Sequence, residues 1–269
     1  MPRCSHSGRK VADLRQMRWL TLGLLVIVAA LLAARTAPSA AAWQHSTACE
    51  AEARALMYRL VQDPAALASF DTAADALGVQ CPPPTMAAGS WPILANLFMQ
   101  RGNHAWGQEQ WDTAGTSYRL AVAYAPQQAP AHRRLAEVLL YHQQQPGAAL
   151  AQLEVAVALD PADGYGYILK AHAYAALNDL PRALEEAQRA VTAANTGYAY
   201  LVQGDMLARL GRWSEAIASY QESIQLDPES GVTFYQLGHA LQAVGRRQEA
   251  QAAWQEAQRL DPSFSIPGS

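Results

Sequence analysis

The sequence GVTFYQLGHALQAVGRRQEAQAAWQEAQRLDPSF, from Gly231 to Phe264, is the clearest copy of a pattern that recurs upstream. Its large, small and turn-forming residues follow a fixed order: Phe234, Leu237, Gly238, Leu241, Ala250, Trp254, Ala257 and Pro262. Small residues let two helices approach closely, and large residues fill the hole that results. Proline cannot continue a helix, so it begins a turn. The stretch therefore predicts two antiparallel helices followed by a turn.

This order resembles the tetratricopeptide repeat, a helix-turn-helix unit that stacks on its neighbours into a solenoid. Counting back from Pro262 gives five units, at residues 95–128, 129–163, 164–196, 197–230 and 231–264. Two positions of each unit are always small, namely Gly102, Ala136, Ala171, Gly204 and Gly238 in the first helix and Ala114, Ala149, Ala183, Ala216 and Ala250 in the second. Alternating β-branched runs are scarce. The expected fold is an all-α solenoid.

Three places depart from the pattern. The second unit carries an extra residue between Tyr141 and Gly147, where Pro146 indicates a turn in place of helix. The third unit has Ala187 where the others have an aromatic residue or leucine, and it lacks the closing proline. No helix is expected after Phe264, so the polar last helix should cover the end of the array itself.

The amino terminus carries a basic leader, residues 1–18, followed by an apolar segment, residues 19–35. Basic residues before an uncharged run predict a cytoplasmic N-terminus and a body outside the cytoplasm. Residues 1–42 hold six Lys/Arg against one acid, whereas residues 43–269 hold fourteen against twenty-two. We expect a retained transmembrane helix, a single-pass signal anchor. The alternative is a signal peptide cut near Ala40-Ala41-Ala42, which would release a secreted or periplasmic protein.

Residues 43–81 are expected to form a helical hairpin. The first helix would run from Ser46 to Val61, and the second from Pro64 to Leu77, with Gly78 at its end. Residues 82–94, which begin with three prolines, then form a stiff linker before the repeats.

The hairpin carries a pair of cysteines, Cys49 and Cys81. Antiparallel helices would bring them together, and paired thiols tend to oxidise outside the cytoplasm, so a disulfide is predicted. Two unpaired buried cysteines are the alternative. A metal site is not expected, because two cysteines without a nearby histidine pair fall short of four ligands.

No motif for catalysis or cofactor binding is present in the sequence. It lacks HExxH, a glycine-rich phosphate loop and the GxSxG nucleophile elbow. His172 and His239 share one unit position but have no partners for a metal or catalytic site in the sequence. The acidic body argues against nucleic acid, which needs a basic face. We therefore expect a non-enzymatic protein without a cofactor.

The resemblance implies a concave groove lined by the first helix of each unit. Its candidate partner-binding residues are Asn103, Arg133, Glu137, Tyr141, Tyr165, His172, Tyr198, Asp205, Arg209, Tyr235 and His239. Tyrosine combines a large contact area with one hydrogen-bonding group, which suits protein or peptide binding. The predicted function is a membrane-tethered scaffold for protein–protein interaction, in assembly or maturation of the cell envelope. The alternative is a glycan-binding accessory of polysaccharide export or glycosylation.

Overall fold

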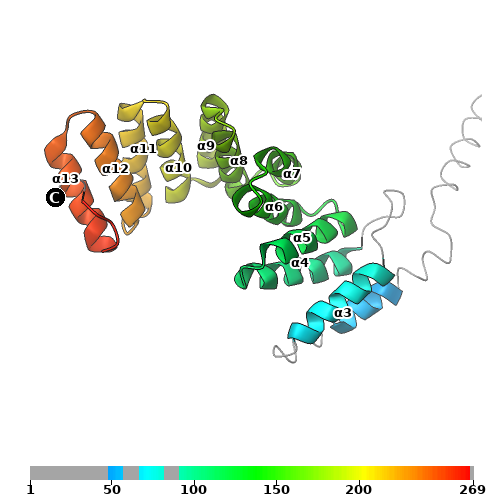
Figure 1. Ribbon diagram of the computed structural model, residues 1–269. Coiled ribbons are helices and arrows are strands. Elements are labelled where there is room, and N and C mark those ends of the chain that lie inside the picture. The colour runs from blue at the N-terminus through cyan, green and yellow to red at the C-terminus, as the bar shows by residue number, and fades with distance from the viewer. Residues whose placement is uncertain (1–47, 57–66, 82–90, 267–269) are drawn as a thin grey trace, which may run out of the picture. The chain divides into compact units, whose positions relative to one another are not determined.

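The computed structural model describes residues 48–56, 67–81 and 91–266 (Figure 1). Within these ranges the chain forms helices and no strand, which confirms the all-α expectation. The chain divides into two compact units, Met1–Trp91 and Pro92–Ser269, and each is described by itself. The predicted leader and apolar segment, residues 1–35, lie outside the described residues. Among the helices that are described, none has the length and apolar character needed to cross a bilayer.

The first unit contains one helix at residues 48–56 and a second, α3, at Leu67–Gln80. Small and aliphatic side chains, Ala53, Leu56, Ala74 and Leu77, are buried in it. The prediction that Gly78 ends the second helix was wrong, because α3 continues through Gly78 to Gln80. Glycine only weakens a helix by about 1 kcal/mol, so it need not end one.

A disulfide bond joins Cys49, near the start of the first helix, to Cys81, which directly follows α3. Both cysteines are almost fully buried. The bond therefore ties the entry of the first helix to the exit of the second.

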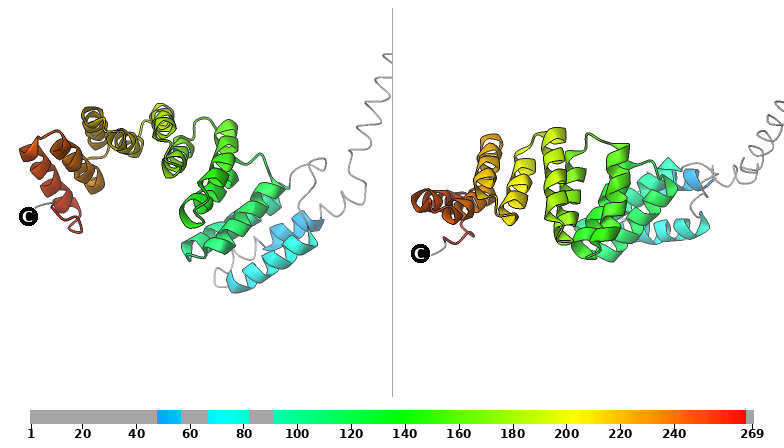
Figure 2. Two further views of the ribbon diagram at one scale, coloured as in Figure 1. Left: turned by 45° about the horizontal axis from the view of Figure 1, so that its top comes forward. Right: turned by 90° about the horizontal axis from the view of Figure 1, so that it is seen from above.

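The second unit is a row of helix pairs, which we number as repeats. Repeat one is α4 (Pro92–Gly107) with α5 (Trp111–Tyr124), and repeat two is α6 (Ala129–Glu137), η2 (Val138–His142) and α7 (Pro146–Leu159). Repeats three, four and five are α8 (Gly164–Ala176) with α9 (Leu180–Ala194), α10 (Gly197–Arg209) with α11 (Trp213–Leu226), and α12 (Gly231–Ala243) with α13 (Arg247–Leu260). Each second helix packs on its own first helix and on the first helix of the next repeat, as Figure 2 shows. The first repeat begins at Pro92, three residues before the counted unit, since α4 includes residues that the sequence assigned to the linker.

Glycine and an aromatic residue face each other where three of the helix pairs cross. A Cβ atom added to Gly204 would lie 2.5 Å from Cε1 of Tyr220, and Gly102 and Gly238 stand in the same relation to Tyr118 and Trp254. Tyr118 and Tyr220 are essentially buried. Because real Cβ atoms do not come this close, glycine at these positions is what lets the ring lie across the helix.

The extra residue of repeat two is absorbed inside a helix. Residues Val138–His142 form a π-helical turn, in which the Gln143 N–H donates to the Val138 carbonyl at 3.0 Å. A π-helical turn holds one more residue than an α-helical turn, so the repeat keeps its register. The expectation that Pro146 replaces helix was wrong. It is the first residue of α7, where a missing N–H does no harm.

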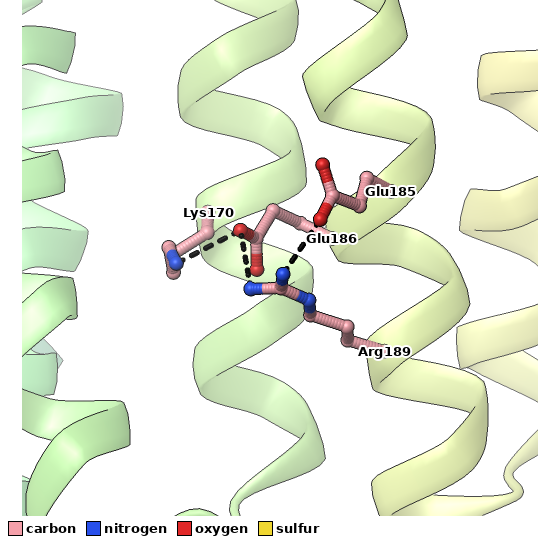
Figure 3. Close-up of polar contacts among 4 residues, drawn as sticks. All are labelled: Lys170, Glu185, Glu186 and Arg189. Carbon is pink, nitrogen blue, oxygen red and sulfur yellow. Dashed lines mark hydrogen bonds and ion pairs between the residues drawn. The ribbon is translucent and has the colours of Figure 1, made fainter.

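The second helix of each repeat has one residue that fills the helix crossing, which we call the filler: Tyr118, Leu153, Ala187, Tyr220 and Trp254. In repeat three this residue is only alanine, and a group of charged side chains lies nearby (Figure 3). Ala171 and Ala187 leave room between α8 and α9, and beside them Nζ of Lys170 bonds Oε1 of Glu186 at 2.9 Å. Arg189 also donates to Glu186, at 3.2 Å, and to the exposed Glu185. Lys170 and Glu186 are both buried. A buried ion pair of this kind contributes little net stability but penalises the loss of either partner.

The end of the array is covered by the chain's own tail as well as by polar residues of α13. The Phe264 ring stacks on Tyr235 with centroids 4.9 Å apart, and Nε2 of Gln258 donates to the Phe264 carbonyl. Ile266 packs against the core of repeats three to five. Earlier repeats have a polar residue at the place of Phe264, such as Thr196, which accepts a hydrogen bond from the Ala199 N–H and caps α10. With phenylalanine there, the chain folds inward onto α12.

Candidate functional site

One residue of each first helix follows the small residue at the helix crossing. These five residues are Asn103, Glu137, His172, Asp205 and His239, and we call them the polar row. In repeat one the Tyr118 hydroxyl donates to Oδ1 of Asn103, and in repeat four the Tyr220 hydroxyl donates to Oδ1 of Asp205, each at 2.9 Å. In both repeats the buried tyrosine ring lies over the glycine, and its hydroxyl reaches the polar-row residue that follows that glycine.

Glu137 is buried in repeat two, where the filler position holds the apolar Leu153. Its carboxylate accepts a hydrogen bond from Nη1 of Arg134 at 2.9 Å. Arg133 lies over the Tyr165 ring, 5.4 Å from its centroid, and forms an ion pair with Asp163 at 2.9 Å. Burial, followed by the charge of Glu137, raises the pKa of Tyr165. The phenol therefore stays protonated at pH 7.

His172 has no polar filler either, since repeat three holds Ala187 at that position. A hydrogen bond of 2.6 Å joins its Nδ1 to the Tyr141 hydroxyl of the π-helical turn. Burial, and secondarily the charge of Arg209, lowers the pKa of His172, while burial raises the pKa of Tyr141. Both groups are therefore neutral at pH 7. The Tyr141 side chain remains 45% exposed.

Tyr198, at the start of α10, is 46% exposed. Partial burial, followed by the charge of Asp205, raises the pKa of Tyr198. Nη2 of Arg209 donates to the Ala175 carbonyl at 3.1 Å, which links α10 back to α8.

Seven predicted groove residues of repeats two to four lie near enough for electrostatic influence on one another's pKa, and a hydrogen bond joins two of them, Tyr141 and His172. We call them the first-helix cluster: Glu137, Tyr141, Tyr165, His172, Tyr198, Asp205 and Arg209.

A hollow of about 410 Å³ opens beside Asp205, between repeats four and five. We call it the Asp205 pocket, and it is lined by Asp205, Met206, Ala208, Arg209, Trp213, Tyr220, Gln236, His239 and Ala240. Burial raises the pKa of Asp205 to about 6, although the Tyr220 hydrogen bond and the charge of Arg209 act in the opposite direction. Burial disfavours the charged form of this carboxylate more than its neighbours stabilise it.

Of the four remaining predicted residues, Arg133 contacts the cluster through the Tyr165 ring and His239 lines the Asp205 pocket, whereas Asn103 and Tyr235 are held elsewhere. Asn103 is held by Tyr118 in repeat one. Tyr235 lies between the Phe264 ring and the His239 ring, whose centroid is 4.6 Å away, and His239 meets Trp254 edge-on at 5.3 Å. Burial lowers the pKa of His239. The ring of Tyr235 thus packs against Phe264, which follows α13, and is less available to a partner than predicted.

Sequence reasoning missed two features of this surface. Trp213 lines the Asp205 pocket from the first position of α11. Because the repeat pattern does not require tryptophan at this position, its presence in the sequence could have marked Trp213 as a candidate site residue. Near repeat one, Trp111 and His142 stack with centroids 3.5 Å apart, and Trp106 meets both edge-on. No spacing rule joins Trp111 to His142, because the contact depends on the π-helical turn.

Within residues 48–56, 67–81 and 91–266, no group of three histidine, cysteine or acidic side chains is arranged to hold a metal ion. The first-helix cluster instead offers aromatic faces, hydroxyls and a few charges. Such a surface is typical of protein or peptide recognition.

Three family models match parts of the second unit. Two described as "Tetratricopeptide repeat" match residues 99–164 and 233–264, and one described as "TPR repeat" matches residues 204–245. The family predicted from the sequence is therefore supported by models at both ends of the array.

Solved structures share the fold. A thermophilic TPR protein of Thermus thermophilus is 24% identical, with a TM-score of 0.54, over 63% of this chain and 92% of that chain. MamA of Desulfovibrio magneticus RS-1 is 16% identical, with a TM-score of 0.55, over 64% of this chain and 97% of that chain. YrrB is 21% identical, with a TM-score of 0.50, over 63% of this chain and 87% of that chain. No protein of curated function matches the sequence.

Proposed function

We propose that the tetratricopeptide repeats of this chain form a non-catalytic scaffold that holds a segment of a partner protein on the first-helix cluster. The observation that carries this proposal is the exposure of Tyr141 and Tyr198, each close to half exposed. The tyrosines that fill the core, Tyr118, Tyr124 and Tyr220, are essentially buried. Tyr141 and Tyr198 are thus not consumed by packing, and their rings are available to a partner.

The neighbouring chemistry supports a peptide-like occupant. Arg209 and Asp205 offer charges of both signs, and the Tyr198 hydroxyl makes no hydrogen bond to any described residue. A peptide backbone presents alternating donors and acceptors that such groups can satisfy. Among the structures of similar fold, YrrB is described as a TPR protein with an unusual peptide-binding site.

We further propose that the repeats lie outside the cytoplasm, tethered by residues 19–35, and act in the cell envelope. The charge asymmetry of the sequence supports this orientation, and the Cys49–Cys81 disulfide fits an oxidising compartment. Protease added to cells with a permeabilised outer layer should digest the repeats while the cytoplasmic membrane is intact. Digestion only after that membrane is lysed would place the repeats in the cytoplasm and refute this location.

A photo-crosslinking amino acid at position 198 tests the scaffold proposal in cells. The matched control carries the same amino acid at Gln221, an exposed residue of α11, the second helix of repeat four. We expect one dominant protein adduct from position 198 that is absent from position 221, identified by mass spectrometry. If position 198 gives no protein adduct while the protein is present and folded, the scaffold proposal fails and glycan binding becomes the better explanation.

A further inference from the structure

Asp205 differs from the other carboxylates near the first-helix cluster in having no ion pair. Glu137 pairs with Arg134, Asp163 with Arg133, and Glu186 with Lys170 and Arg189. Within the described residues, Asp205 has one hydrogen bond, from the Tyr220 hydroxyl, and no cation at ion-pair distance. A carboxylate has room for about four hydrogen bonds, so most of its accepting capacity is unused.

The unused side of Asp205 belongs to the Asp205 pocket. Trp213 and Met206 provide aromatic and aliphatic lining, and a volume of about 410 Å³ leaves space for a long side chain. Arg209 also lines this pocket, but its guanidinium donates to the Ala175 carbonyl of α8 and makes no ion pair with Asp205. The charge of Arg209 acts on Asp205 from nearby, but no ion pair joins them, so the carboxylate keeps unused accepting capacity toward the pocket.

We propose that the Asp205 pocket binds a cationic side chain, lysine or arginine, of the partner that lies on the first-helix cluster. The cationic head bonds the Asp205 carboxylate, and the aliphatic stem packs on Trp213 and Met206. Tryptophan adds cation–π attraction when a cation lies over its face. This inference rests on the proposed function and names the chemistry that the partner presents at repeat four.

The charge of the whole body agrees with a cationic partner. Residues 43–269 hold fourteen Lys/Arg and twenty-two Asp/Glu. A net negative body attracts a positively charged segment and disfavours an acidic one.

Repeat one supplies the matched variant. Asn103 occupies the place of Asp205 in the polar row, and its Oδ1 accepts from Tyr118 at the same 2.9 Å. Asp205→Asn therefore keeps the acceptor for Tyr220 and removes only the negative charge. Glu222→Gln, on the exposed surface of α11, removes one negative charge away from the pocket and serves as the control.

The experiment is an NMR titration of the purified full chain labelled with 15N. The signal followed is the indole N–H of Trp213, assigned by its loss in Trp213→Phe. The probes are N-acetyl-lysine methylamide, N-acetyl-arginine methylamide and the neutral N-acetyl-norleucine methylamide. We expect the two cationic probes to shift the Trp213 signal and to bind at least about tenfold more tightly than the neutral one.

In Asp205→Asn this preference for the cationic probes should disappear, while Glu222→Gln should keep it. Equal binding of the norleucine probe in the wild type, or an unchanged preference in Asp205→Asn, would overturn the inference.

Photo-crosslinking at position 198 in the Asp205→Asn background separates this inference from the proposed function. Loss or strong reduction of the partner adduct supports the cationic site. An unchanged adduct, with no preference among the probes, refutes the cationic site and leaves the scaffold intact. If the wild type gives no adduct but the lysine probe still binds, the site is supported and the scaffold proposal fails.

Discussion

Replacing Gly204 by alanine tests whether the close crossing of α10 and α11 sets the stability of repeat four. The added Cβ would lie 2.5, 2.7 and 3.0 Å from three ring atoms of Tyr220. The ring has little freedom to move, because it is buried and its hydroxyl is bonded to Asp205. Overpacking of this kind costs about 1–3 kcal/mol, and the better helix propensity of alanine offsets about 1 kcal/mol. We expect a net destabilisation of up to about 2 kcal/mol.

The control is Gly147→Ala in α7, where nothing lies within 4 Å of the added Cβ. It should leave stability unchanged or raise it slightly. A second variant, Gly204→Ala with Tyr220→Leu, copies the Ala136 and Leu153 combination of repeat two and should recover part of the loss. Repeat arrays do not unfold in two states, so amide hydrogen exchange of α10 and α11 is the appropriate assay. Unchanged exchange in Gly204→Ala would refute the steric reasoning.

Two further outcomes follow from buried charges. Lys170→Met should destabilise repeat three by up to about 3 kcal/mol because it leaves the buried Glu186 with only its contact to Arg189, whereas Lys170→Met with Glu186→Leu should be closer to neutral; equal losses by hydrogen exchange in α8 and α9 would contradict this. Burial raises the pKa of Asp205 to about 6, above its unfolded value, so stability falls as pH rises from about 4 to 6. Asp205→Asn should therefore flatten this part of the wild-type pH profile, which thermal unfolding between pH 4 and 7 measures.

The fold followed from the sequence because its determinants are local and repeated. Small and large residues at fixed spacing specify which helix surfaces meet, and each helix pair contacts mainly its neighbours. The same spacing could not reveal the π-helical turn, since an extra residue near Pro146 is compatible with a loop or with a bulged helix. It also could not pair Lys170 with Glu186, because the contact joins two helices in the one repeat where both packing residues are alanine.

The candidate site was predicted only through the family resemblance, which marks inward positions but does not say how they are connected. Tyr235 illustrates the difference. Its position matches the groove pattern, but the tail after α13 places Phe264 on its ring. Trp213 illustrates the opposite error, because it lies on a second helix and still lines the Asp205 pocket. Both outcomes depend on how neighbouring segments meet, which the repeat period does not encode.

The polar row explains which side chains remain available to a partner. In repeats one and four the hydroxyls of Tyr118 and Tyr220 satisfy the polar row from within the repeat. In repeats two and three the corresponding residues, Leu153 and Ala187, have nothing to donate, and residues of first helices supply the partners instead.

Arg134 bonds Glu137, and the Tyr141 hydroxyl bonds His172. The Tyr141 hydroxyl is therefore already used within the array. The Tyr198 hydroxyl and the open side of the Asp205 carboxylate have no such commitment among the described residues. Repeat four is thus where the proposed partner would gain polar contacts without breaking a hydrogen bond that the described residues already make.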